Sequence, residues 1–231
     1  MGILPPQPPL LDIGPYVSLD CEMVGVGPLF KSRRQNSLLF ESRSSLARVS
    51  IVNYYGHVLL DTFVQQHEPV TDYRTAISGV RPEDVVGPSA LPFSVVRNQV
   101  ISLLRNRILI GHAVHNDLRS LRYSHPSEYI RDTQQCPQVK ERHGPQTIGL
   151  KTLCSVEFGI DVQPGEHSSV KDARAAMALF RLYRTQWEAS LAARSYVHWS
   201  PNPTNVVDTR FSTILVTTPL LLHRLVNAGD Q

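Results

Sequence analysis

The first regular feature of the chain is an alternation of apolar and polar side chains between Tyr16 and Val24. Successive side chains of a β-strand point to opposite faces, so a period of two predicts a strand here. One predicted face is apolar, and the other carries Ser18, Asp20 and Glu22.

The remaining pattern as far as residue 190 predicts an α/β fold, with a mixed central sheet flanked by helices. Apolar residues three and four apart favour helices, whereas short apolar runs bounded by turn residues favour strands. After the first strand, we expect strands over 46–53 and 58–64, a helix entered at Pro82, a helix over 93–105, a strand over 108–110, and helices over 116–121, 151–158 and 169–191.

Three segments follow from this pattern: a Pro-rich stretch over 1–14, one domain over 15–190, and a tail over 191–231 of unassigned role. The tail is interrupted by prolines and has one strand-like run, Ser212 to Thr217. No apolar run reaches the roughly 20 residues that cross a bilayer, so no membrane partner is expected.

Composition adds little to this picture. The formal charge of +3 permits a polyanionic partner without identifying one. Three cysteines without paired spacing favour neither a disulfide framework nor a zinc finger, and the N-terminus does not resemble a signal peptide. A reducing intracellular compartment is therefore expected.

Asp20 and Glu22 are two residues apart in the first predicted strand, so their carboxylates share a face and could hold a hard divalent cation. The alternative is an ordinary solvated strand face. Apolar neighbours on both sides of the strand favour the cation, because two buried carboxylates need a partner for their charge.

Two more acids lie near predicted helix starts. Asp117 follows the strand that ends at Gly111, and ligands of α/β sheets gather at such strand ends. Asp172 opens the last predicted helix. Each has a structural alternative: a helix dipole favours an acid such as Asp117 in the first turn, and Ser169 with Asp172 has capping-box spacing.

His167 is the candidate general base, although an isolated histidine is more often a surface residue. On a regular helix His167 would lie about 140° around from Asp172, so the two converge only if His167 precedes the helix. Four carboxylates holding two cations, with a histidine that deprotonates a water, suit hydrolysis of a phosphodiester.

Three segments, 18–27, 111–118 and 167–177, resemble the exonuclease motifs of the DEDDh superfamily. Within it the chain is most similar to the RNA exonuclease 4 group. That likeness is carried by residues 47–53, 70–76, 78–83 and 130–133, and the whole resemblance covers about residues 15–190.

The resemblance implies that the mixed central sheet flanked by helices is ribonuclease-H-like. It also implies hydrolysis of single-stranded RNA from its 3′ end to nucleoside 5′-monophosphates, with two Mg²⁺ ions or Mn²⁺ as a substitute. It assigns the metal to Asp20, Glu22, Asp117 and Asp172, and general-base catalysis to His167. It also implies substrate contacts at Met23, Ser78, Gly79, His112 and Asn116. Arg48, with Arg33, Arg34 and Arg43, is a further candidate for phosphate contact.

The group further implies a role in ribosomal RNA processing in the nucleus, including the nucleolus, with the cytoplasm as the alternative compartment. A monomer is expected. Two departures from the group are a longer, arginine-rich loop over 29–45 and the lack of a lysine-rich N-terminal extension. Two other functions stay open: a 3′–5′ exonuclease acting on DNA, and a catalytically silent module that binds nucleic acid.

Overall fold

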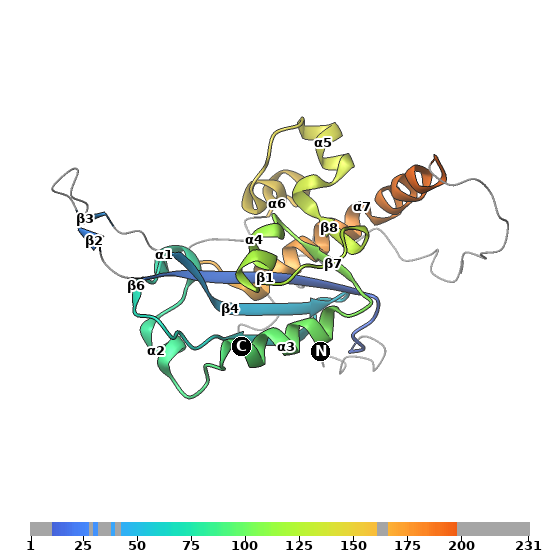
Figure 1. The fold of residues 1–231 in the computed structure, drawn as a ribbon. Coiled ribbons are helices and arrows are strands. Elements are labelled where there is room, and N and C mark those ends of the chain that lie inside the picture. Colours follow the sequence, from blue (N-terminus) through green and yellow to red (C-terminus); the bar gives the residue numbers. More distant parts are fainter. Residues whose placement is uncertain (1–10, 28–29, 32–37, 40–42, 161–165, 198–231) are drawn as a thin grey trace, which may run out of the picture.

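The computed structural model describes residues 11–27, 30–31, 38–39, 43–160 and 166–197 (Figure 1). These residues form a mixed central sheet flanked by helices, which confirms the predicted α/β class. No helix in the described ranges combines the length and apolar character needed to span a membrane.

The main sheet has six strands, and its centre is the first strand predicted from the sequence. Its path runs β5-β4-β1-β7-β8, and β6 pairs with the far end of β1. β1 is antiparallel to β4 and β6 but parallel to β7, which is in turn parallel to β8. The strands are β1 (Tyr16–Val26), β4 (Arg43–Asn53), β5 (Val58–Phe63), β6 (Val70–Asp72), β7 (Ile108–Gly111) and β8 (Ile130–Asp132).

The other elements are helices and a small second sheet, in which two short strands, β2 (Phe30–Lys31) and β3 (Leu38–Leu39), pair with each other. The α-helices are α1 (Thr75–Ser78), α2 (Pro82–Val86), α3 (Phe93–Leu104), α4 (His115–Ser120), α5 (Pro137–His143), α6 (Leu150–Phe158) and α7 (Ser169–Val197). Two 3₁₀ turns, η2 (Ser127–Tyr129) and η3 (Thr133–Gln135), flank β8.

Helices cover both faces of the main sheet, and α3 and α7 lie on opposite sides of it (Figure 1). On one face Val96, Val100 and Leu104 of α3 pack against Val17 and Leu19 of β1. On the other face α7 buries a stripe at helical spacing, which includes Ala173, Ala176, Met177, Phe180 and Tyr183. The polar face of β1 is therefore turned toward α7.

A third, smaller cluster joins the α1–α2 segment to the far end of β1. Val80 and Val85 are fully buried against Val24, Val26 and Ala47. This contact matters for the site, because it fixes the α1–α2 segment relative to the strand that carries the first two acids.

The predicted elements are present, with shifted ends. The last helix continues to Val197, and β6, β8, α1 and α5 were not predicted, since each is short and lacks a clear periodicity. The strand-like run over 212–217, Arg33 and Arg34 lie outside the described residues.

Candidate active site

β1 and α7 bring three carboxylates together. Asp20 and Glu22 project from the same face of β1, and Asp172 lies in the first turn of α7 on that face. One ligand oxygen from each of these three acids lies within 4.8 Å of the others. The structure thus assembles the predicted acid pair with Asp172.

Asp117, the fourth predicted acid, contacts the same strand from α4. It lies in α4, directly after β7, and is 5% exposed. Its Oδ1 accepts a hydrogen bond of 3.1 Å from the main-chain N–H of Cys21, the residue between Asp20 and Glu22. The fourth predicted acid is therefore held against the same stretch of β1, although it is not in the 4.8 Å group.

The turn between β7 and α4 is shaped by its own sequence and by Asp132 of β8. Gly111 is required, because a Cβ there would lie 2.8 Å from the side chain of Val114. Ala113 adopts a left-handed φ of 53°, and Asp132 accepts hydrogen bonds from the N–H groups of Ala113 and Val114 at 2.9 and 3.1 Å. Asp132 thereby orients the start of the helix that carries Asp117.

His167 precedes α7, as the spacing argument required for it to approach Asp172. Its Nδ1 lies 3.5 Å from Oδ2 of Asp172, and its side chain is 34% exposed. The main-chain N–H of His167 donates to the carbonyl of Ile77 in α1 at 2.9 Å. The imidazole is thus held beside the acids while keeping contact with solvent.

The crowded carboxyl groups favour protonated forms in the absence of a cation. Burial, followed by repulsion from the other acids, raises the pKa of Asp20 well above its usual value. Burial is also the main cause that raises the pKa of Glu22 and of Asp117 to about 8. The hydrogen bond with Asp172 raises the pKa of His167.

These features fit a divalent cation. Carboxylate oxygens are the ligands that Mg²⁺ and Mn²⁺ prefer, and a cation would offset the repulsion that raises these pKa values. Oε1 of Glu22 is buried and finds no hydrogen-bond partner among the described residues. A buried polar atom without a partner is costly, and a metal ion would satisfy it.

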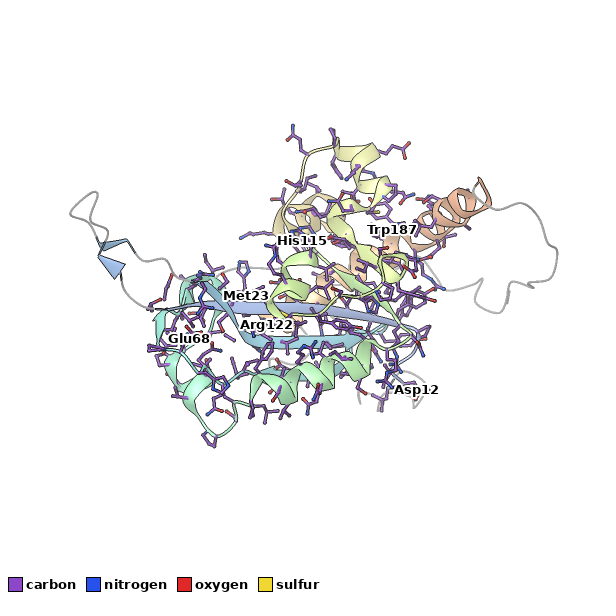
Figure 2. The ribbon with its side chains drawn as sticks, in the orientation of Figure 1. Asp12, Met23, Glu68, His115, Arg122 and Trp187 are labelled. Carbon is purple, nitrogen blue, oxygen red and sulfur yellow. The ribbon has the colours of Figure 1, made fainter. Side chains whose placement is uncertain are left out.

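A cavity of about 560 Å³ is lined by Met23 of β1, Phe93 of α3 and Asn116 of α4, and none of the four predicted acids lines it. Figure 2 labels Met23, Glu68 and Arg122, three of the residues that line it. The basic side chains lining it are Arg43, Arg74, Arg119, Arg122 and His67. The cavity therefore has a largely basic wall next to Met23 and Asn116, which are the sequence neighbours of Glu22 and Asp117. Arg33 and Arg34 lie outside the described residues.

Four of the predicted substrate residues make specific internal contacts. Arg48 donates two hydrogen bonds of 2.8 Å, from Nε and Nη2, to the carboxylate of Asp61, and its guanidinium lies over the ring of Phe63. Two of its three guanidinium nitrogens are therefore bonded within the protein. Ser78 is 2% exposed and bonds the main chain of its own turn.

Gly79 and His112 are close to the catalytic candidates. A Cβ on Gly79 would lie 2.9 Å from the carbonyl oxygen of His167. Nδ1 of His112 is 2.9 Å from Oγ1 of Thr133, and burial lowers the pKa of His112. Neither residue lines the cavity between Met23 and Asn116.

Sequence reasoning did not identify Asp132, Arg81, Glu166, Arg119 of α4 or Arg122 just after α4 as site residues. Asp132 lies in the 130–133 segment that resembles the RNA exonuclease 4 group, which is a signal for its importance but not for its hydrogen bonds. Arg119 and Arg122 gave no pattern, because their positions depend on where α4 lies relative to β1.

The RNase_T family model, described as exonuclease, matches residues 17–180. RNA exonuclease 4 of Cryptococcus neoformans var. neoformans serotype D is 48% identical over 192 residues, which are 83% of this chain and 44% of that protein. RNA exonuclease 4 of Xenopus laevis is 46% identical over 178 residues, or 77% of this chain and 39% of that protein. The chain spans less than half the length of these two relatives.

Solved structures share the fold. The Pan2 pseudoubiquitin hydrolase-RNA exonuclease module of Saccharomyces cerevisiae, in complex with AAUUAA RNA, has a TM-score of 0.62 and 25% sequence identity. The match covers 81% of this chain and 33% of that one. The Neurospora crassa Pan2 catalytic unit, at 20% identity and a TM-score of 0.61, covers 82% of this chain and 30% of its own. These neighbours agree with the predicted ribonuclease-H-like architecture.

Proposed function

Because the chain belongs to the exonuclease family whose model it matches over residues 17–180, we propose that it removes nucleotides one at a time from the 3′ end of RNA. Membership confirms the resemblance predicted from the three motifs. The 3′-to-5′ direction, the metal dependence and the RNA substrate are part of the proposal. Relatives named RNA exonuclease 4, at 46–48% identity, support RNA as the substrate.

The observation that carries the proposal is the convergence of three carboxylates within 4.8 Å, with His167 3.5 Å from one of them. Asp20, Glu22 and Asp172 would hold divalent cations, with Asp117 beside them. When bound, such ions lower the pKa of a water and offset the charge that develops on the leaving oxygen.

In the proposed reaction, His167 accepts a proton from the water that attacks the last phosphodiester. A P–O bond forms to the water oxygen as the bond to the 3′-oxygen of the preceding nucleotide breaks. That oxygen takes up a proton, so the products are a nucleoside 5′-monophosphate and an RNA one nucleotide shorter. His167 is suited to this role, because an imidazole can accept and return a proton near physiological pH.

The cavity supports the release of single nucleotides. Its volume of about 560 Å³ is lined by Met23 and Asn116, each of which is the sequence neighbour of a predicted metal-binding acid. We propose that the terminal nucleoside enters this space, with apolar contact from Met23. The arginine-lined wall would attract the phosphates of the strand.

A single assay tests the proposal. The purified protein is incubated with RNA labelled at its 5′ end, and with a DNA strand of matched sequence, in Mg²⁺, Mn²⁺ or EDTA. We expect a ladder that shortens by one nucleotide, requires the metal, and forms faster on RNA. Faster shortening of DNA would instead identify the alternative DNA exonuclease, and no cleavage in any condition would identify a silent binding module.

We propose ribosomal RNA precursors as the substrate and the nucleus as the compartment, with nucleolar enrichment. The support is the resemblance of residues 15–190 to the RNA exonuclease 4 group. Depletion of the protein from its source cells should lengthen precursor 3′ ends, as measured by 3′-end sequencing. Unchanged precursors together with a cytoplasmic location of the tagged protein would overturn this part.

A further inference from the structure

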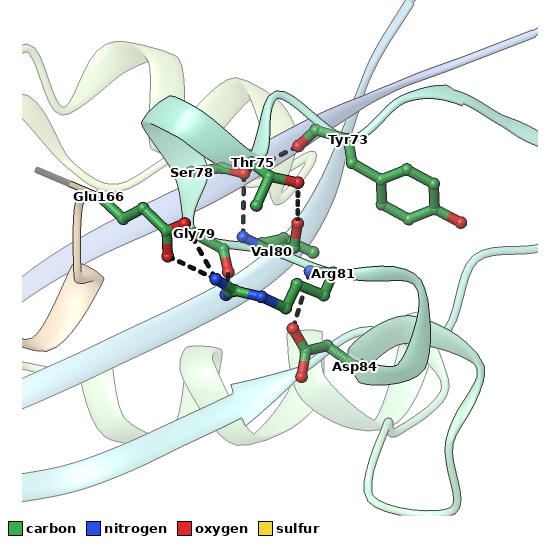
Figure 3. A network of polar contacts seen from close by, with 8 residues as sticks. All are labelled: Tyr73, Thr75, Ser78, Gly79, Val80, Arg81, Asp84 and Glu166. Atoms are coloured by element: carbon green, nitrogen blue, oxygen red, sulfur yellow. Dashed lines mark hydrogen bonds and ion pairs between the residues drawn. The ribbon is translucent and has the colours of Figure 1, made fainter.

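A network of polar contacts joins the α1–α2 segment to the residues before α7 (Figure 3). Nη1 of Arg81 donates to the carbonyl of Gly79 at 2.9 Å, and Nη2 of Arg81 donates to both carboxylate oxygens of Glu166 at 2.9 Å. Glu166 is the residue immediately before His167. One guanidinium therefore bridges the two segments next to the candidate base.

The main chains of these segments also touch. The N–H of His167 donates to Ile77, while Gly79, with a left-handed φ of 65°, leaves room for the carbonyl of His167. A Cβ at Gly79 would come within 2.9 Å of that carbonyl oxygen. The main chain of His167 therefore packs closely against the α1 turn, at its N–H through Ile77 and at its carbonyl through Gly79.

The α1–α2 segment is itself well ordered by local bonds. Oγ of Ser78 donates to the carbonyl of Tyr73, and Oγ1 of Thr75 donates to the carbonyl of Val80. The N–H of Arg81 donates to Asp84 at 2.8 Å (Figure 3). Together with the buried Val80, these contacts fix the position of Arg81 relative to β1, independently of its contact with Glu166.

The Arg81–Glu166 pair is exposed, with 46% and 44% of the two side chains accessible. Exposed ion pairs contribute little to global stability, because solvent screens them. The two-sided contact with Gly79 and Glu166 instead restricts where the following residue can lie. A pair of this kind is suited to holding a side chain in place.

We propose that Arg81 and Glu166 are positioning residues that hold His167 at the acid cluster during hydrolysis. This inference rests on the proposed role of His167 as general base. The pair links the α1–α2 segment, anchored on the strand of Asp20 and Glu22, to the residue beside His167. Its loss would let His167 move relative to both acids without removing any group that touches the substrate.

The test combines kinetics on the full chain with a double-mutant cycle. Misplacement of a catalytic group by about 1 Å costs up to roughly 100-fold in rate, so Arg81→Gln and Glu166→Gln should each lower kcat by about 10- to 100-fold. KM and the melting temperature should stay near the wild-type values. The double variant should lose no more than either single variant, because both act through one contact.

Glu83→Gln is the matched control. Glu83 is an exposed acid two residues from Arg81, so its replacement also removes one negative charge from this segment. The control should keep full kcat. Effects of Arg81→Gln and Glu166→Gln that multiply in the double variant, or a rise in KM alone, would overturn the proposal and indicate that Arg81 binds RNA directly.

A second readout does not depend on cleavage. The amide of His167 is bonded to Ile77, and its hydrogen exchange should accelerate in Arg81→Gln and Glu166→Gln but not in Glu83→Gln. Unchanged exchange with unchanged kcat would overturn the positioning role. An inactive wild-type protein would overturn the proposed function, while faster exchange in the two variants would still show that the pair holds this peptide unit.

Discussion

The main-chain N–H of Cys21 donates a hydrogen bond to the carboxylate of Asp117 at 3.1 Å. This bond ties α4 to β1 at the residue between Asp20 and Glu22. Asp117 consequently has two functions that can be separated: it accepts a structural hydrogen bond, and it adds negative charge to the acid cluster.

Asp117→Asn and Asp117→Ala should therefore differ in stability while both lose cleavage. Asparagine keeps a carbonyl acceptor for Cys21, whereas alanine leaves a buried N–H without a partner, which costs about 1–3 kcal/mol. Urea denaturation in EDTA should show this lower free energy of unfolding for Asp117→Ala only. Equal stabilities would mean that the bond to Cys21 contributes nothing measurable.

His167→Ala should reduce kcat by about 10²–10⁴-fold, which is typical for the loss of a general base, while the protein still binds Mg²⁺. Single-turnover cleavage measures the first effect and calorimetric titration with Mg²⁺ the second. His57→Ala, in the turn between β4 and β5, is the control and should keep full activity. Loss of Mg²⁺ affinity in His167→Ala would show that His167 is a metal ligand.

Mg²⁺ should raise the melting temperature of the wild-type protein, because a ligand that binds only the folded state stabilises it. At about 100 times the dissociation constant the gain is about 2.7 kcal/mol. Asp20→Asn should abolish both this shift and cleavage. It should also raise the melting temperature in EDTA, since it removes one of several repelling buried carboxyl groups. A full Mg²⁺ shift in Asp20→Asn would refute the assignment.

The metal-free protein should become less stable as the pH rises from about 5 to 8. Glu22 and Asp117 have folded-state pKa values of about 8, above their ordinary values of 4.5 and 3.8. Across this window these two acids bind more protons in the folded state than in the unfolded state, so their contribution to the free energy of unfolding falls with pH. The raised pKa of His167 acts in the same direction. The lowered pKa values of His112 and His125 oppose this fall only up to about pH 6.5.

Thermal unfolding in EDTA at several pH values measures this slope, and saturating Mg²⁺ should flatten it. The contribution of Asp61, whose pKa is lowered by its contact with Arg48, is complete above pH 4 and does not enter the window. A melting temperature in EDTA that stays constant or rises toward pH 8 would contradict the prediction.

The sequence was sufficient to predict the strands and helices whose apolar side chains follow a regular period. The alternation in β1 placed Asp20 and Glu22 on one face, and the apolar stripe of α7 placed Asp172 near the same sheet. Helix geometry gave only a condition for His167, namely that it approaches Asp172 if it precedes the helix, and the structure meets that condition. Local periodicity is visible in sequence because backbone geometry imposes it.

Contacts between distant segments could not be predicted in this way. Arg48 was considered a phosphate contact from its charge, whereas the structure pairs it with Asp61 of the neighbouring strand. Arg81 and Glu166 meet across 85 positions of sequence. Such pairs depend on the register of strands and the packing of loops. These leave no periodic pattern in a single sequence, so the pairs could not be predicted from it.

The placement of the acids on β1 and α7 has a consequence for folding during synthesis of the chain on the ribosome. Domains fold as units after their residues have been synthesised, and β1 leaves the ribosome well before Asp172 of α7. The nascent chain therefore holds an incomplete set of acids until α7 docks on the sheet. The proposed catalytic site therefore cannot be complete until most of the chain has been synthesised.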